Sequence, residues 1–342
     1  MRTAGRILVL LLAVAASVFA ADSGLLNLVM PDAAVVVGIR VEQILASPIG
    51  QSILSQAAVP AEEITKVIAL VGFDPRRDVS EVLIAAPAGS SSKERRGLLL
   101  ARGSFDPARL SALAQLGKAE LTTYQGVQIA SSKEKEPMAL AFLDQSTLAA
   151  GDPESVRGAI GRRGSPVRLP AKLMAKVNEL GGAYDIWGVS VIPPAEMAKA
   201  LPNPQVSGAL KGDMLQGIEQ VSGGVRLSSR IDISFEALTR SEKDATALND
   251  VVRFLTGLAL SQGKPGAAKA LENLQLKVEG RTVKFALTIP EQQVAQMIEA
   301  QKKALAAQRA RAKPAPERPA DSSITIYSSP KDMGVVKLPG PK

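Results

Sequence analysis

The stretch AAVVVGIRVEQILASPIGQSIL (residues 33–54) decides the fold of this chain. Its first part, residues 33–41, has the density of β-branched residues that is typical of a buried strand. Ser47 and Pro48 then predict the start of a helix. A serine oxygen accepts a hydrogen bond from the free amides of a first helical turn, and proline fits that turn because no backbone donor is needed there. The stretch therefore predicts a strand followed by a helix.

The same order returns later in the chain. The segment AYDIWGVSVIPPAEMAKAL (183–201) restates an apolar strand at 184–192 and a proline-led helix at 196–201. The elements that follow each segment also match in order. We therefore predict an α+β fold of two tandem copies of one unit, in which mostly antiparallel sheets carry packed helices. Each unit is expected to contain a strand, a helix, a hairpin, a helix, a strand pair and a helix.

The other elements are predicted from apolar periodicity and from turn residues. Asp106, Asp152 and Ser241 stand directly before predicted helices, so helix capping accounts for them without a catalytic role. Further strands are expected at 79–86, 97–104, 122–130, 138–142, 147–150, 217–227, 229–238, 274–279 and 282–289. Further helices are expected at 61–71, after 106, at 152–160, at 172–180, from 241 to 260, and from 290.

The two ends of the chain differ from its middle in composition. Arg2 and Arg6 precede an apolar run and a small-residue cleavage site at Ala20, which is typical of a signal peptide. An uncleaved anchor is the alternative, but the apolar run is shorter than the roughly 20 residues of a membrane-spanning helix, so no span is expected after cleavage. The predicted parts are a signal peptide (1–20), a first unit (21–164), a second unit (165–301), a projecting helix end (302–312) and a disordered basic Pro/Ala-rich tail (313–342).

The net charge of +8 belongs to the two ends of the chain, with +2 in the leader and +6 in the tail, and not to the folded body. The leader carries two basic residues, and residues 302–342 carry nine basic and three acidic residues; removing both from the totals leaves 30 charges of each sign. A neutral body and an aromatic content of 3% argue against a nucleic-acid surface. The basic tail instead predicts contact with envelope proteins or anionic envelope polymers, although a merely solubilising tail is an equal alternative.

The residues that most enzymes use are missing. The chain has no His and no Cys, which excludes serine triads, thiol proteases, disulfides and thiolate metal sites. Carboxylate chemistry remains open, and Asp74, Asp78 and Glu81 are its candidates in a hydrolase. No catalytic, cofactor-binding or metal-binding residue is assigned. Trp187 is the sole tryptophan and is expected in the core because the strand around it is apolar.

Five segments together resemble a group of uncharacterised exported bacterial proteins of similar length. They are DAAVVVGI (32–39), ASPIGQ (46–51), VGFDPRRDVSEVLIA (71–85), GLLLARGSFD (97–106) and TYQGVQIA (123–130). The resemblance covers most of the mature chain and implies export and a similar fold. Its motifs are turns and caps, so it implies no catalytic residue.

These observations predict a non-enzymatic binding or scaffold protein of the cell envelope, periplasmic or extracellular, with no cofactor. The alternatives are the carboxylate hydrolase and a protease-inhibitor or chaperone-like binder. The one candidate binding segment is ITIY, a short strand pattern inside the tail, and we expect it to add to an exposed sheet edge on a partner or on this chain. Its residues are Ile324, Thr325, Ile326 and Tyr327.

Overall fold

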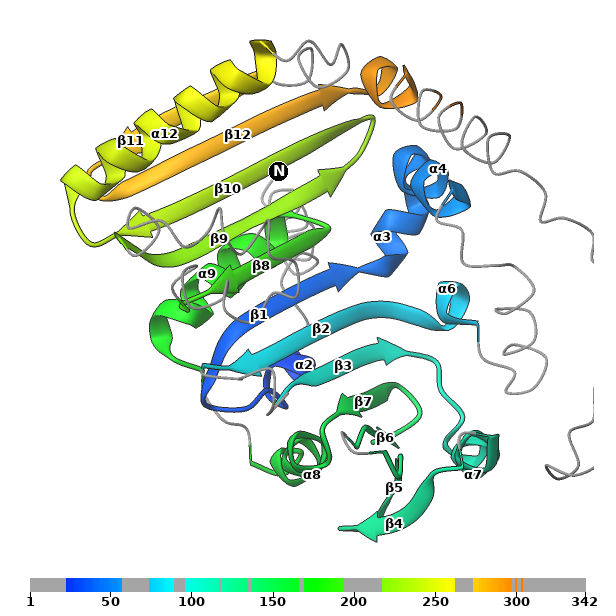
Figure 1. Ribbon diagram of the computed structural model, residues 1–342. Helices are drawn as coiled ribbons and strands as arrows, with labels where there is room; N and C mark the ends of the chain where they lie inside the picture. Colours follow the sequence, from blue (N-terminus) through cyan, green and yellow to red (C-terminus); the bar gives the residue numbers. More distant parts are fainter. Residues whose placement is uncertain are drawn as a thin grey trace, which may run out of the picture. The chain divides into compact units, whose positions relative to one another are not determined.

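The described strands join into one twelve-stranded sheet in which every neighbouring pair is antiparallel (Figure 1). Its order is β11-β12-β10-β9-β8-β1-β2-β3-β7-β6-β5-β4. Helices lie against the sheet, so the predicted α+β class with antiparallel pairing is confirmed. The computed structural model describes residues 23–56, 74–88, 96–116, 118–134, 137–165, 169–192, 217–261 and 273–296, with residues 299 and 303.

The strands have the following bounds. They are β1 (Ala33–Arg40), β2 (Val79–Pro87), β3 (Leu98–Gly103), β4 (Glu120–Tyr124), β5 (Val127–Ser131), β6 (Ala139–Phe142), β7 (Thr147–Gly151), β8 (Ile186–Ser190), β9 (Ile218–Leu227), β10 (Arg230–Thr239), β11 (Leu274–Glu279) and β12 (Thr282–Pro290). The helices are α2 (Ser23–Leu26), α3 (Val41–Ala46), α4 (Pro48–Gln56), α6 (Pro75–Asp78), α7 (Leu110–Leu116), α8 (Pro153–Arg162), α9 (Ala171–Ala183) and α12 (Glu242–Ser261), with a short 3-10 turn at Pro107–Arg109.

One row of directly opposed residues crosses seven strands and forms the floor of the main core. Because residues opposite each other in a ladder share a face, the whole row lies on one side of the sheet. Helices α2, α8 and α9 pack on that side and contribute Leu25, Val156 and Leu173 to the same cluster. The row runs through Trp187, Gly38, Leu83, Leu100, Ala149, Ala141 and Ile129.

Trp187 lies between two glycines in this row. Its direct partners are Gly38 on β1 and Gly224 on β9. A Cβ atom on Gly38 would stand 2.3 Å from the indole, and the space beside Gly224 is filled by the ring of Tyr184. Trp187 is 1% exposed, which confirms the expected core position. The glycine at the centre of the opening strand therefore makes room for the tryptophan of the later strand.

The opposite side of the sheet is covered from its two ends. Helix α12 packs on β10, β11 and β12 around Ala237, Leu248 and Val283. Helix α7 packs on β5 with Leu110 and Ala130 at the centre of a smaller cluster. These two clusters cover the two ends of this face, while the main core covers the other face from β8 to β5.

The cap predictions hold in the structure. Ser47 Oγ accepts a hydrogen bond from the Gly50 amide at 2.8 Å, and Asp152 accepts one from Ser155 at 2.9 Å. Asp106 accepts one from Ala108 at 3.1 Å. Ser241 Oγ accepts the Asp244 amide at 3.1 Å, while the Asp244 carboxylate accepts from the Ser241 hydroxyl and not from its backbone amide. Local polar chemistry at helix starts was therefore readable from the sequence.

Two element predictions are wrong. The strand expected at 122–130 is split into β4 and β5 by a two-residue turn at Gln125 and Gly126, both of which have positive φ. This turn twists with the strands it joins, so it closes a hairpin and not a bulge. The opening strand ends at Arg40 and not at residue 41, because α3 begins at Val41. The helix expected to begin at Pro48 is therefore the second helix after β1.

The chain separates into two compact units, residues up to Gln296 and residues from Met297. In the first unit, one core joins residues from both sides of residue 164, such as Leu25 and Leu83 with Leu173 and Val189. No helix among the described residues is both long and apolar enough to cross a membrane. The predicted signal peptide (1–20), the helix at 61–71, the helix at 196–201 and the tail at 313–342 lie outside the described residues.

Candidate functional site

A cavity of about 820 Å³ opens at the end of the sheet where β1 ends and β8 begins. We call it the β1–β8 pocket. Residues from the loops and helix ends around these strands line it, together with the turn that joins β9 to β10. The lining side chains that matter below are Arg40, Ser47, Asp185, Arg226, Leu227 and Glu291.

A buried ion pair forms the inner wall of the pocket. Arg40 lies on the same face of β1 as Val36 and Gly38, so its side chain continues the core row toward the strand end. Its Nη2 donates to Asp185 Oδ1 at 3.2 Å, and the two side chains are 12% and 7% exposed. The backbones of the same two residues are also hydrogen-bonded, because the Arg40 amide donates to the Asp185 carbonyl at 2.8 Å.

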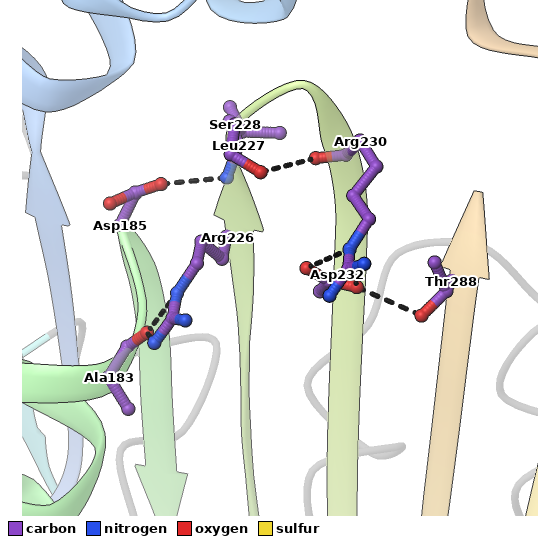
Figure 2. A network of polar contacts seen from close by, with 8 residues as sticks. All are labelled: Ala183, Asp185, Arg226, Leu227, Ser228, Arg230, Asp232 and Thr288. Carbon is purple, nitrogen blue, oxygen red and sulfur yellow. Dashed lines mark hydrogen bonds and ion pairs between the residues drawn. The ribbon is translucent and has the colours of Figure 1, made fainter. Parts of the chain in front are cut away.

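The second carboxylate oxygen of Asp185 is also occupied. Asp185 Oδ2 accepts the Leu227 amide at 2.7 Å (Figure 2). Asp185 therefore links β1 on one side to β9 on the other. Taking two charges out of water costs several kcal/mol for each ion, and the ion pair together with the bond from Leu227 offsets part of this cost. The buried Nε of Arg40 has no hydrogen-bond partner among the described residues. The pair is a structural joint at the centre of the sheet.

Arg226 stands at the outer wall of the pocket and is exposed. Its Nε and Nη2 both donate to the carbonyl oxygen of Ala183, at 2.7 Å for Nε (Figure 2). Its guanidinium carbon lies 5.9 Å from the centre of the Tyr184 ring, within the range of a cation–π contact. These contacts fix the guanidinium in place without giving it a carboxylate ion-pair partner among the described residues.

A second charged cluster stands beside the pocket on β10 and β12. Arg230 Nε donates to both oxygens of Asp232 at 2.9 Å, and the Thr288 hydroxyl donates to Oδ1 at 2.9 Å (Figure 2). Burial alone would raise the pKa of Asp232, but hydrogen bonds from Arg230 and Thr288 outweigh it and hold the pKa below its ordinary value. Arg226 lies directly opposite Asp232 in the β9–β10 ladder and its charge also lowers this pKa, so the cluster is electrostatically coupled to the pocket.

Two polar side chains of the lining are held by hydrogen bonds within the protein. Each oxygen of Asp185 accepts one hydrogen bond, and Ser47 Oγ accepts from Gly50 and donates to the Ile44 carbonyl at 3.2 Å. Glu291, by contrast, is an exposed carboxylate of the same lining. Within the described ranges, no three His, Cys, Asp or Glu side chains gather as metal ligands.

The carboxylates proposed for a hydrolase lie elsewhere. Asp78 Oδ2 accepts the Asp74 amide at 2.7 Å, which closes the turn before β2. Glu81 lies on β2 opposite Arg40 on one side and Arg102 on the other. None of the three lines the β1–β8 pocket. The predicted binding residues Ile324, Thr325, Ile326 and Tyr327 lie outside the described residues.

Sequence reasoning missed Arg40, Asp185 and Arg226 as members of one site. One signal was present. Asp185 interrupts an apolar strand run, and a charge inside such a run has to find a partner or a hydrogen-bond donor when it is buried. Arg40 ends the matching run in the first half. The partner became identifiable only with the β1–β8 pairing, which joins residues 145 positions apart.

No family model matches the chain, and no curated protein matches it. Two solved structures are similar to it in part of their backbone path. They are crystal form IV of TP0453, with a TM-score of 0.49 and 14% identity, and crystal form I of TP0453, with a TM-score of 0.47 and 13% identity. Each likeness covers 80% of this chain and 96% of the other.

Proposed function

We propose that this chain is an exported cell-envelope protein that binds or scaffolds without catalysing a reaction. The observation that carries the proposal is the β1–β8 pocket, whose buried carboxylate, Asp185, accepts hydrogen bonds from Arg40 and the Leu227 amide. Such a pocket offers volume, charge and fixed walls but no free acid or base on its inner side. The leader-like residues 1–20 and the basic tail support an envelope location and an envelope partner.

Export is tested by fractionation and by the mass of the mature protein. We expect the chain expressed in its own host to leave the cytoplasm and to begin at Ala21, because the small residues before that position fit a cleavage site. Intact-mass measurement of the envelope fraction reads the new N-terminus. A cytoplasmic protein that still begins at Met1 would contradict the location.

Binding is tested by affinity capture from the envelope fraction with three baits. They are residues 21–342, residues 21–313, and the Arg226→Gln form of residues 21–342. If the tail holds the partner, the truncated bait loses it; if the pocket holds it, the Arg226→Gln bait loses it. A partner that all three baits retain equally would exclude both surfaces, and a turnover of envelope polymer by the purified protein would overturn the non-enzymatic assignment.

We also propose that the two halves are copies of one unit. The strand order on the two sides of the β1–β8 pair supports this, since β1-β2-β3-β7-β6 has its counterpart in β8-β9-β10-β12-β11. Helices α2 and α9 precede β1 and β8 and pack on the same face, while α7 and α12 follow β3 and β10 and pack on the other. Matched elements therefore occupy matched places in the sheet.

The register of the central pair agrees with this proposal. The opening strands predicted at 33–41 and 184–192 are offset by 151 residues (184 minus 33). At that offset Val36 corresponds to Trp187 and Gly38 to Val189, and all four lie on the same face, because Val36 pairs with Val189 and Gly38 with Trp187. An even offset would place corresponding residues on opposite faces of the sheet.

A further inference from the structure

The charges around the β1–β8 pocket indicate what it binds. Arg40 and Asp185 neutralise each other inside the wall. The remaining charged side chains of the lining are Arg226, whose guanidinium has no carboxylate within ion-pair distance among the described residues, and the exposed Glu291. The outer part of the pocket therefore presents one held positive charge and one solvated negative charge.

The guanidinium of Arg226 is prepared to receive an anion. A guanidinium has five N–H donors, and the contacts to Ala183 use donors on Nε and Nη2. The cation–π contact with Tyr184 and the anchoring carbonyl hold the group still, so little side-chain entropy remains to be lost on binding. The turn residues Ser228 and Ser229 add hydroxyls to the same lining.

From these contacts we propose that the β1–β8 pocket binds a small anionic molecule through Arg226. The chemical class is a carboxylate or a phosphate ester whose remaining atoms lie against the apolar part of the lining, which includes Ala46, Pro48 and Leu227. A guanidinium pairs with either head group through two parallel hydrogen bonds. This inference rests on the proposed binding function and specifies the ligand of the same site.

The charge signs make the proposal testable without knowing the natural ligand. The probes are 1-anilinonaphthalene-8-sulfonate, an anion, and N-phenyl-1-naphthylamine, which has the same ring body and no charge. Arg226→Gln should weaken binding of the anionic probe about fivefold, and Glu291→Gln should strengthen it about twofold, because exposed charge pairs contribute up to about 1 kcal/mol. The neutral probe should change less than twofold in both variants.

Arg230→Gln is the matched control. Arg230 is an exposed arginine of the same hairpin, paired with Asp232 and absent from the pocket lining. Because Arg230 pairs with Asp232, which lies opposite Arg226, its substitution should weaken binding of the anionic probe less than Arg226→Gln does. Trp187 emission and far-ultraviolet circular dichroism of each variant verify that the fold is retained before titration.

Two outcomes overturn the proposal. One is that Arg226→Gln weakens both probes equally, or that Arg230→Gln weakens the anionic probe as much as Arg226→Gln does. Either result would mean that the probe binds to another apolar surface. The other is weaker anion binding in Glu291→Gln. Competition by benzoate and by phenyl phosphate then distinguishes the two head groups. If the anionic probe fails while envelope capture succeeds, the ligand assignment is wrong and the proposed binding function stands.

Discussion

Two glycines, Gly38 and Gly224, determine how the centre of this sheet packs. Gly38 is the position where β1 gives way to Trp187, because a Cβ there would stand 2.3 Å from the indole. Gly224 does the same for Tyr184 on the other side of the tryptophan. Large aromatic side chains beside glycine fill the gap in a strand pair and fix its register. The packing at the centre of the sheet thus requires glycine at both positions.

The first prediction concerns Gly38→Ala. Overpacking of this kind costs about 1–3 kcal/mol, so the free energy of unfolding should fall by that amount. Urea denaturation followed by the fluorescence of Trp187 measures it. Gly161→Ala is the control, because Gly161 lies in α8 with nothing within 4 Å of the added atom. A Gly38→Ala protein as stable as the control would contradict the packing described for Trp187.

The second prediction concerns Asp152, whose carboxylate caps α8 and also accepts the Gly97 amide at 2.9 Å. Burial alone would raise the pKa of Asp152, but hydrogen bonds from Ser155 and Gly97 lower it below its ordinary value of 3.8. A carboxylate with a depressed folded pKa stabilises the protein above its unfolded pKa and loses this contribution as the pH falls through the folded pKa.

Asp152→Asn should therefore lower the free energy of unfolding by about 1 kcal/mol at neutral pH, since the Gly97 amide loses its acceptor. The difference between the two proteins should shrink as the pH falls from the ordinary carboxyl pKa through the lowered pKa of folded Asp152, where its charge is lost. Denaturation series at several pH values test this. Asp106→Asn, which changes the cap of a three-residue 3-10 turn, should have a smaller effect. A difference that is independent of pH would show that the charge is irrelevant.

At the scale of elements, the joint between β1, β8 and β9 carries a prediction of its own. Asp185→Ala removes the bonded partner of the buried Arg40 side chain, which costs about 3–5 kcal/mol. The double variant Arg40→Met with Asp185→Ala removes both charges and should recover part of that loss. Urea denaturation of the wild-type protein, of the single variants Arg40→Met and Asp185→Ala, and of the double variant gives the coupling energy. Additive losses would mean that the pair contributes nothing as a pair.

The sequence predicted those elements whose signals are local. Proline after a capping side chain marked the starts of α4 and α8, and apolar runs around a polar loop marked β2 and β3. The turn at Gln125 and Gly126 was missed although these two residues interrupt the apolar alternation between Tyr124 and Val127. Helix α3 was missed because its residues VEQILA extend an apolar strand run, and no side-chain cap separates the two.

No local sequence pattern predicts which strands far apart in the chain pair with each other. The opening strand β1 and the strand β8, whose sequence resembles it, are direct antiparallel neighbours in the sheet. Repeated sequence elements indicate similar units but do not say which strands meet. The residues of the candidate site come together only because β1 and β8 pair. The sequence contains each of these residues but does not show that they belong to one site.

At the scale of the whole molecule, the core is shared between the halves. Helix α9 belongs to the second half and packs on β1 as well as on β8 and β9. Leu173 and Val177 of this helix belong to the same cluster as Leu83 and Leu100 of the first half. Neither half buries this surface alone, and an exposed core of that kind destabilises an isolated fragment.

We therefore predict that residues 21–164 and 165–301, expressed separately, are each less stable than the joined chain. In the second fragment Trp187 loses its neighbour strand, so its emission should shift to longer wavelength. Mixing the fragments should reverse the shift as β1 and β8 pair again. Native emission from the second fragment alone would mean that each half folds independently.

The described sheet is open, and it ends at β4 on one side and β11 on the other. An unpaired rim is a template on which a second molecule can continue the ladder. On β11 this is opposed by charge, since Glu279 bonds Lys277 at 2.5 Å and Lys284 at 2.6 Å, and these bonds lower the pKa of Glu279 to about 2. A neighbour joining there would have to separate these charges from one another and from water. The charged side chains of Lys277, Glu279 and Lys284 thus oppose the pairing of a second chain at the β11 edge.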